Sequence, residues 1–346
     1  MPSRANQKIR VLVAGVGGAS LGTEIIKCLA LAGRYQIFGC DISPYAFGLY
    51  EPTLQDAFLA DRDNYVQSVL EVSRKSHVQV IVPGGEQPLA LLGAAREVFR
   101  KNGILIAANS QALTERFADK SETFRVLKSL DIAVPATLAI RSPSQIRDIP
   151  YPCIIKPARG SGGSFSVFLA ASPAEAAHYI SHVAASGGEA VVQEYIADSE
   201  GEFTVGVLHL PDDRLAGSIA LRRLLDPKLS YVFKSATGVI SSGYSQGLIA
   251  EFPEVRITAE RIANAVGSKG PLNIQGRVRK GTLLPFEINA RFSASTYLRA
   301  LAGFNEVDIF LQHLVLGRRA ANHQVRSGYY LRTLNERFVP LSAIKS

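Results

Sequence analysis

The chain has 346 residues, 47% hydrophobic and 20% charged, so it is long enough for two or three packed lobes and too apolar to be disordered. Its 38 lysines and arginines outnumber its 30 acidic residues, and the resulting charge of +8 would suit nucleic acid, acidic membranes or anionic small ligands. The basic residues form no lysine-rich arm with interleaved aromatics, and several lie beside glycine loops. This distribution favours phosphate ligands over nucleic acid.

The first residues of the chain and its cysteines indicate the cellular compartment. The first ten residues lack the apolar core of a secretory signal, and no uncharged apolar stretch reaches the roughly 18 residues that cross a bilayer. We therefore expect a cytoplasmic protein that does not contact a membrane. Cys28, Cys40 and Cys153 lie in apolar runs without CxxC spacing, so we expect core residues, not disulfides or zinc ligands.

The first third of the chain alternates short apolar runs with helical patterns. Apolar, β-branched runs predict buried strands at 9–15, 36–41, 78–85 and 103–108. Apolar residues at helical spacing predict helices at 23–33, 64–75 and 88–101. This alternation specifies a parallel sheet covered by helices on both faces, and we assign it to an α/β lobe over residues 1–108.

The pattern changes after about residue 109. The expected elements are a helix over 119–130, strands near 136–140, 153–157 and 164–169, and a helix that starts near Pro173. They predict a small α+β lobe over 109–190. From 191 onward longer strands with tight turns dominate, at 202–221 and 270–291, with helices near 254–266 and 305–316. This third lobe, 191–346, is expected to be mainly antiparallel.

A glycine loop follows the first strand. In AGVGGASLG, Gly15 and Gly17 fit a dinucleotide-binding fingerprint, but Ser20 takes the third position. Asp41 ends the second strand and could bind a ribose, so an NAD-dependent oxidoreductase stays open. The alternative is that the loop is only a tight turn.

A lysine precedes a second glycine loop, at 154–167. Lys156 ends a strand, and Gly160, Gly162 and Gly163 follow it with two serines, so backbone amides there could close over a polyphosphate. It is not a P-loop, because the lysine comes before the glycines and strands flank both sides. A flexible hairpin with an exposed lysine is the competing interpretation.

Three oxygen-bearing side chains lie on two consecutive strands near the end of the chain. Glu287 and Asn289 are two residues apart and share one face of their strand. If the turn is centred on Gly281, Gln275 lies directly opposite Glu287. One carboxylate and two amides suit a partial Mg²⁺ site, although polar residues hydrogen-bonded at a strand end would show the same pattern.

Two other sequence patterns do not predict a metal site or a catalytic nucleophile. His178 and His182 have the spacing of a helical metal pair, but without a third ligand a solvated helix face is expected. No GxSxG motif occurs, and no cysteine has an evident histidine partner, so hydrolytic nucleophile chemistry is not predicted.

In the order of these features the chain resembles the ATP-grasp superfamily, in particular its carbamoyl-phosphate-synthase-like branch. The resemblance covers nearly the whole chain. It implies an α/β fold with an N-terminal Rossmann-like parallel lobe, a small α+β lid and a mainly antiparallel C-terminal lobe, with ATP held between the last two.

The resemblance also implies site residues. Lys120 and Lys156 match the basic residues that reach the ATP phosphates, and a flap over the phosphates matches Ser161, Gly162, Gly163 and Ser164. The stretch VVQEYI matches the adenine hinge of the family, where Glu194 and the backbone of Tyr195 and Ile196 would meet the base. Glu202 matches the acidic residue that binds the ribose. Metal ligands match Gln275, Glu287 and Asn289, and the arginine near the transferred phosphate matches Arg291. Ala290 departs from the proline of many relatives, but that position supplies no ligand.

The activity implied is that of an ATP-dependent ligase. ATP, with Mg²⁺ or Mn²⁺, would activate a small carboxylate as an acyl phosphate, which an amine attacks, and Arg291 and Lys156 would act in catalysis. A homodimer is compatible with this activity, and nucleic acid is not needed. A non-catalytic nucleotide-binding regulator stays open as another class, as does the oxidoreductase.

The segment 222–247 is the candidate for binding the acid. It carries Arg222, Arg223 and Lys234 among glycines and serines. Because side chains alternate along a strand, one of the two arginines is expected to bind the carboxylate and the other to face solvent. A mobile, solvated loop is the competing interpretation.

Overall fold

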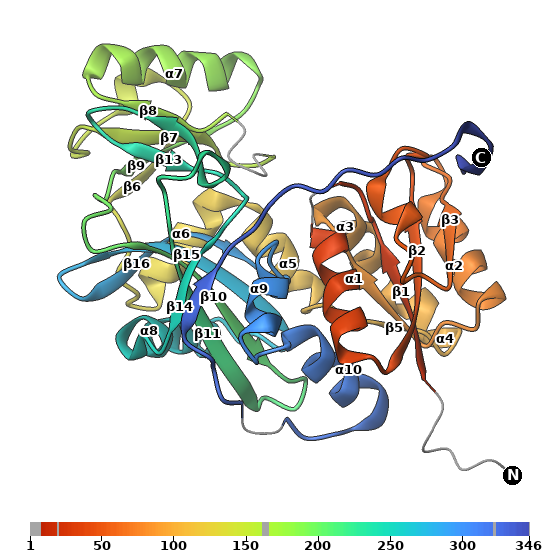
Figure 1. Ribbon diagram of the computed structural model, residues 1–346. Helices are drawn as coiled ribbons and strands as arrows, with labels where there is room; N and C mark the ends of the chain where they lie inside the picture. The colour runs from red at the N-terminus through yellow and green to blue at the C-terminus, as the bar shows by residue number, and fades with distance from the viewer. Residues whose placement is uncertain (1–7, 19–20, 161–165, 321–322, 346) are drawn as a thin grey trace, which may run out of the picture.

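The computed structural model describes residues 8–18, 21–160, 166–320 and 323–345. Figure 1 shows three sheet-containing parts: a parallel sheet with its helices in the N-terminal lobe, a small sheet beneath helix α7, and a larger antiparallel sheet that α9 and α10 separate from the N-terminal lobe.

The N-terminal lobe is the predicted parallel sheet, in the order β3-β2-β1-β4-β5. Its strands are β1 (Ile9–Ala14), β2 (Tyr35–Asp41), β3 (Asp56–Leu59), β4 (Val80–Pro83) and β5 (Leu105–Ile106), and its helices are α1 (Leu21–Ala32), α2 (Tyr65–Lys75), α3 (Glu86–Ala94) and α4 (Arg96–Lys101). Alternate residues of β1 enter two different cores: Val11 and Val13 pack on the side of α1, and Leu12 and Ala14 pack on the opposite side. The sheet is therefore covered on both faces, as predicted.

Two details of this lobe differ from the sequence prediction. Strand β3 was not predicted, because its DAFL sequence is too short and polar for a buried-strand signal. The helix expected over 88–101 is two helices, α3 and α4, with Ala95 between them.

The small lobe has an antiparallel sheet in the order β6-β9-β7-β8. Its strands are β6 (Thr137–Ile140), β7 (Cys153–Pro157), β8 (Phe168–Ala170) and β9 (Ala190–Glu194). Helix α7 (Pro173–Ala185) starts at the expected proline, after the N-cap Ser172, and packs Ile180 and Val183 on the sheet. Strand pairing keeps β9 in this lobe, so the change to the larger sheet follows Glu194, not residue 190.

Two consecutive helices connect the first lobe to the small one. They are α5 (Gln111–Ala118) and α6 (Lys120–Ser129). The Asp119 side chain accepts from the amides of Ser121 and Glu122 and so begins α6. This cap fixes the place of Lys120 at the first turn of α6.

The third lobe is an antiparallel sheet in the order β16-β15-β10-β11-β14-β17. Its strands are β10 (Glu202–His209), β11 (Leu215–Arg223), β14 (Gly247–Ala250), β15 (Pro271–Arg279), β16 (Thr282–Asn289) and β17 (Gly328–Tyr330), and its helices are α8 (Pro253–Ala265), α9 (Thr296–Leu301) and α10 (Glu306–Leu316). A separate two-stranded sheet, β12 (Tyr231–Lys234) and β13 (Val239–Ser241), lies in the 222–247 segment. The mainly antiparallel character is confirmed.

Helix α1 joins the first lobe to the third. Its apolar side shares one core with Leu298, Phe304 and Phe310 from the region of α9 and α10. The C-terminal segment then runs back across the first lobe (Figure 1), where Arg332 pairs with Glu24 of α1 at 2.8 Å. These contacts fix the first lobe beside the end of β16.

The cysteines are free and buried, as expected. Burial raises the pKa of the Cys40 thiol to about 12 and that of Cys153 to about 11. The described part of the chain contains no cluster of three or more His, Cys, Asp or Glu residues that could hold a metal ion. It also contains no helix long and apolar enough to cross a membrane.

Candidate functional site

Two adjoining cavities lie where the small lobe, the third lobe and the first lobe meet. The β9 cavity, of about 80 Å³, is lined by the end of β9 and by β7, β13 and β15. The β16 cavity, of about 240 Å³, is lined by the end of β16 and by helices α3, α5 and α6. Lys120, Phe286 and Glu287 line both. A ligand could therefore extend from one cavity into the other.

The hairpin of β15 and β16 carries the predicted oxygen ligands. Gln275 pairs with Glu287 across the hairpin, which confirms the predicted register. The turn is formed by Lys280 and Gly281 with φ of 52° and 74°, the positive values that a two-residue hairpin turn requires. Turn chemistry thus decides which side chain lies opposite Glu287.

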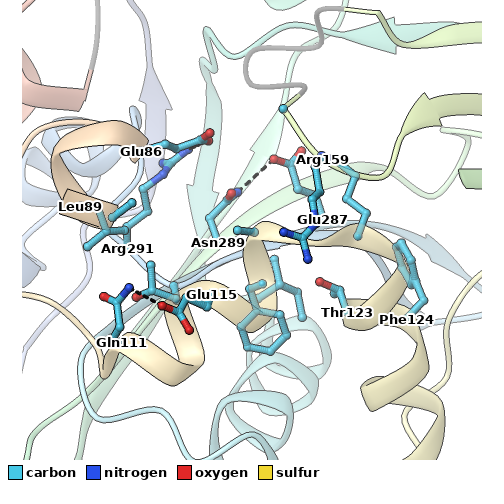
Figure 2. Close-up of a pocket in the computed structure, with 18 of the residues that line it drawn as sticks. Glu86, Leu89, Gln111, Glu115, Thr123, Phe124, Arg159, Glu287, Asn289 and Arg291 are labelled. Atoms are coloured by element: carbon cyan, nitrogen blue, oxygen red, sulfur yellow. Dashed lines mark hydrogen bonds and ion pairs between the residues drawn. The ribbon is translucent and has the colours of Figure 1, made fainter. Parts of the chain in front are cut away.

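Glu287 and Asn289 both line the β16 cavity and are joined by a hydrogen bond, in which Asn289 Nδ2 donates to Glu287 Oε1 at 3.1 Å (Figure 2). Gln275 is half-buried and is absent from the described lining of either cavity. Two of the three predicted metal ligands therefore share one cavity, and the assignment of all three stays a prediction.

Arg291 lies two residues after the end of β16 and lines the same cavity. Its Nη2 donates to Glu86 Oε1 of α3 at 3.0 Å, and its Nη1 donates to the Phe292 carbonyl at 2.9 Å. Its Nε is buried and has no hydrogen-bond partner among the described residues. Figure 2 shows the contact between Arg291 and Glu86 on the side of Leu89, away from Glu287.

Lys156 is a buried cation at the site. The side chain is 5% exposed, and Nζ donates to Gln193 Oε1 at 3.0 Å and to the Phe286 carbonyl at 2.9 Å. Burial lowers its pKa to about 7, while Glu287 opposes this shift and Lys120 adds to it. The competing interpretation of this loop, a flexible hairpin with an exposed lysine, is therefore wrong for Lys156.

Arg159 was missed from the sequence although it follows the same strand. It lines the β16 cavity and pairs with Asp119 at 2.9 Å. The dipeptide Arg159–Gly160 directly precedes the predicted flap, and this position is the sequence signal that could have identified Arg159. The flap residues Ser161, Gly162, Gly163 and Ser164 lie outside the described residues.

The residues of the predicted adenine hinge line the β9 cavity. Glu194 accepts from the Ala136 amide at 3.0 Å and also pairs with Arg279, so its carboxylate holds the hinge in place. The Tyr195 hydroxyl accepts from the Val239 amide at 2.8 Å.

Glu202 also lines the β9 cavity, but two arginines neutralise it. Arg223 Nη1 lies 2.8 Å from one carboxylate oxygen and Arg277 Nε lies 2.8 Å from the other. The pKa of Glu202 is lowered by these charges, against the opposing effect of burial. Arg277, which sequence reasoning missed, also donates to the carbonyls of Ile196 and Val239.

The three predicted acid-binding residues are not placed together. Arg222 is exposed and Arg223 is fully buried, so the expected alternation is present. Arg223 is held by Glu202, and Lys234 pairs with the exposed Asp226 at 2.9 Å. None of the three is among the described residues that line either cavity, so their role in binding the acid stays a prediction.

The first glycine loop serves close backbone packing. A Cβ on Gly22 would lie 1.9 Å from the Gly15 carbonyl oxygen, and one on Gly84 would lie 2.0 Å from the same atom. Gly15 has a φ of 93°, and its own Cβ would lie 2.9 Å from Pro88. The tight-turn interpretation explains these contacts without a dinucleotide.

A family model for the ATP-grasp domain matches residues 117–295, slightly more than half of the chain. The chain belongs to the ATP-grasp family. The matched range begins before Lys120 and ends after Arg291, so it contains the whole described lining of the β9 cavity. It also contains the described lining of the β16 cavity, except the residues from α3 and from the first part of α5.

Two curated ATP-grasp relatives are similar over limited parts. The D-alanine–D-alanine ligase of Thermotoga petrophila is 34% identical over 90 residues, 26% of this chain and 28% of the relative. The carbamoyl phosphate synthase large chain of Sulfolobus acidocaldarius is 22% identical over 325 residues, 89% of this chain and 30% of the relative. The matches thus span less than a third of either curated relative.

Solved ATP-grasp structures share the fold over most of the chain. The L-amino acid ligase of Bacillus licheniformis has a TM-score of 0.67 at 14% identity, covering 90% of this chain and 75% of that one. The biotin carboxylase domain of the Hydrogenobacter thermophilus 2-oxoglutarate carboxylase, solved with MgADP, has a TM-score of 0.67 at 17% identity, covering 92% and 73%. These likenesses establish the three-lobed ATP-grasp fold.

Proposed function

We propose that the chain is an ATP-dependent ligase that activates a small carboxylate as an acyl phosphate and transfers the acyl group to an amine, with release of ADP and phosphate. The observation that carries this proposal is the pair of adjoining cavities. The β9 cavity has the predicted adenine hinge, and the β16 cavity has Glu287, Asn289 and Arg291. Lys120 and Glu287 line both, at the place that phosphates extending from the hinge would reach.

The residues of the β16 cavity fit a Mg²⁺ ion. Glu287 and Asn289 carry oxygen atoms that could be ligands, and the hydrogen bond from Asn289 Nδ2 to Glu287 Oε1 supports the assignment because it brings the two side chains together. Mg²⁺ commonly takes one or two protein carboxylates and completes its shell with substrate phosphates and water. Bound there, the ion would neutralise charge on the phosphates. Mn²⁺ prefers the same oxygen ligands.

The cations of the chain suit phosphoryl transfer. Such a reaction depends on positioning and on neutralising the phosphate oxygens, not on a covalent group of the protein. Lys156 lines the β9 cavity, Lys120 lines both cavities, and Arg291 lines the β16 cavity. Arg291 would bind a substrate oxyanion in place of the exposed Glu86 carboxylate with which it now pairs.

The acid and the amine would bind beyond the phosphates, on the α3 and α5 side. An acyl phosphate forms only if the acid oxygen lies in line with the terminal phosphate, so the acid must approach Arg291. The contact of Arg291 with the Glu86 carboxylate supports this placement, because a ligand carboxylate could take the same position on the guanidinium. The partners proposed are therefore small-molecule substrates, in a cytoplasmic enzyme that could act as a homodimer.

A test is ADP release with Mg·ATP over a panel of carboxylates, each with a set of amines. The proposal expects ADP release that requires both an acid and an amine, with a new amide in the product. If ATP binds but no pair raises ADP release above background, the chain is a nucleotide-binding regulator instead. If NADH binds tightly and ATP does not, the oxidoreductase alternative holds.

A further inference from the structure

A third cavity lies in the first lobe, outside the ligase site. It has a volume of about 270 Å³ and is formed at the carboxyl ends of β1, β2 and β4. The strand order reverses between β1 and β4, and ligands of open parallel sheets bind at such a point. This switch-point cavity shares no lining residue with the β9 or β16 cavity in the described chain.

Tyr65 lines this cavity, and its buried hydroxyl has no hydrogen-bond partner in the part of the chain that the structure describes. The residue is 7% exposed. Burial raises the pKa of Tyr65 above its usual range, and the charges of Cys40 and Asp41 add to the rise. The hydroxyl therefore stays protonated, and buried polar groups are rarely left unpaired.

The same cavity has a positive side. Arg62 lines it and has no hydrogen bond or ion pair with another described residue. Helix α3 begins here at Glu86, and its N-cap Gly85 provides no side-chain cap, so the amides of Glu86 and Gln87 can face an anion, whereas Pro88 has no amide. One carboxylate group of a ligand could use both features.

The opposite side carries a negative charge. The two Asp41 oxygens accept from the amides of Val16 at 2.8 Å and Ser43 at 3.1 Å, and each oxygen keeps a lone pair for a ligand donor. Ile42, Pro88 and Leu91 supply apolar wall. A doubly charged phosphate would be repelled by Asp41, and a neutral sugar would leave Arg62 unused. A zwitterion with an apolar part uses all of these groups.

A dinucleotide does not suit the cavity. Pro88 lies against Gly15, at the point where a pyrophosphate would approach the loop, and the glycines are used for packing. The volume is also below the roughly 300 to 1,000 Å³ of pockets that enclose drug-sized ligands.

We propose that the switch-point cavity binds a small amino acid, with the ligand carboxylate at Arg62 and the start of α3, the ammonium at Asp41, and the Tyr65 hydroxyl as a further partner. This site is separate from the ligase site, and it stands whether or not the ligase proposal holds.

The test is calorimetric titration of the full chain, saturated with Mg·ADP, with L-alanine, L-valine and L-leucine. Their amides, which lack the carboxylate, and the matching acids without the amino group serve as comparison ligands. We expect at least one amino acid to bind and both comparison ligands to bind at least about tenfold more weakly, because each loses one charged contact. Absence of binding by every amino acid up to millimolar concentration would overturn the proposal.

Variants locate the binding. Arg62→Gln should raise the dissociation constant about tenfold or more, whereas Arg147→Gln, on another exposed arginine, should not change it. Tyr65→Phe should leave the melting temperature of the ligand-free protein equal or higher, because it removes an unpaired buried hydroxyl, and should still weaken binding. Binding lost in Arg291→Ala but intact in Arg62→Gln would place the amino acid in the β16 cavity and refute the site.

Discussion

At the residue scale, Glu287 is the single carboxylate of the predicted metal set. Replacing it by Gln keeps its size but removes the charge that would hold Mg²⁺ against the phosphates. We expect Glu287→Gln to lower the rate of ADP release by roughly 3 to 4 kcal/mol, a few hundredfold, with an unchanged circular dichroism spectrum. Glu254→Gln, on an exposed carboxylate of α8, is the matched control. Wild-type turnover of the Glu287 variant at ordinary Mg²⁺ would refute the metal assignment.

The depressed pKa of Lys156 makes nucleotide binding depend on pH. Without ligand the pKa is about 7, because burial disfavours the cation. Phosphate oxygens favour the cation, so the pKa should rise in the complex, and ATP binding should take up a proton between pH 7 and 9. The affinity should therefore be full below pH 7 and fall as the pH rises above it.

Titration calorimetry at pH 8 in two buffers of different ionisation enthalpy measures this uptake. Wild type should take up most of one proton per ATP, whereas Lys156→Met should take up none and bind ATP more weakly. Equal uptake by both proteins would show that another group carries the proton.

At the scale of elements, the β12 and β13 hairpin is fixed by the Glu202 ion cluster. Arg277 donates to the Val239 carbonyl at 2.8 Å, and Arg223 donates to the carbonyl of Ser242 just after β13. Val239, Ile240 and Ser241 in turn line the β9 cavity. The segment expected to bind the acid therefore forms a wall of the predicted nucleotide site.

This arrangement predicts that substitutions of the adjacent Arg222 and Arg223 have different effects on stability and on the KM for ATP. Arg223→Met leaves Glu202 buried with one partner fewer, so it should destabilise the fold by about 3 to 5 kcal/mol and raise the KM for ATP more than that for the acid. Arg222→Met, on the exposed neighbour, should change stability by no more than about 0.5 kcal/mol. Thermal unfolding and steady-state kinetics on both variants measure this difference. A selective rise in the KM for the acid in either variant would support the original acid-binding hypothesis.

The elements show why some of the site could be predicted and some could not. The alternation of β15 and β16 and the Lys280–Gly281 turn are local, and they were enough to place Gln275 opposite Glu287. The partners of Glu202 lie 21 and 75 residues away, and no local pattern signals such long-range pairing. For the same reason Arg223 was one of the two arginines considered for binding the acid, although it is buried against Glu202.

At the scale of the whole molecule, the strand and helix order was enough to predict three lobes, because hydrophobic periodicity reports which faces are buried. The path of the C-terminal segment was not predicted. Its exposed Leu334 and Phe338 give no periodic signal, and it is held instead by polar contacts to the first lobe. Arg332 donates to Glu24 at 2.8 Å and also bonds the Ala294 carbonyl near the end of β16.

Through Arg332, this segment connects helix α1 of the first lobe to the chain just after β16. Glu86, Leu89 and Ala90 of the first lobe line that cavity, whereas the described lining of the β9 cavity starts at Lys120 and contains no residue of the first lobe. Loosening the first lobe should therefore disturb the acid side of the proposed site and leave the nucleotide side intact. Arg332→Ala should raise the KM for the acid severalfold with little change in that for ATP, and it should cost about 1 to 3 kcal/mol of stability, because Glu24 is buried and loses its strongest partner.

Lys27→Ala is the matched control for Arg332→Ala. Lys27 pairs with the same Glu24 at 2.9 Å, but it is 39% exposed and lies on the same helix. It reaches the third lobe through a cation–π contact, 5.6 Å from the centre of the Tyr297 ring, and not through a charged hydrogen bond such as that of Arg332. We expect its removal to change stability by less than about 1 kcal/mol and to leave both KM values unchanged. Steady-state kinetics with the acid and ATP varied in turn separate the two effects. If Arg332→Ala raises both KM values equally, the C-terminal segment stabilises the fold as a whole and does not hold the first lobe over the acid side.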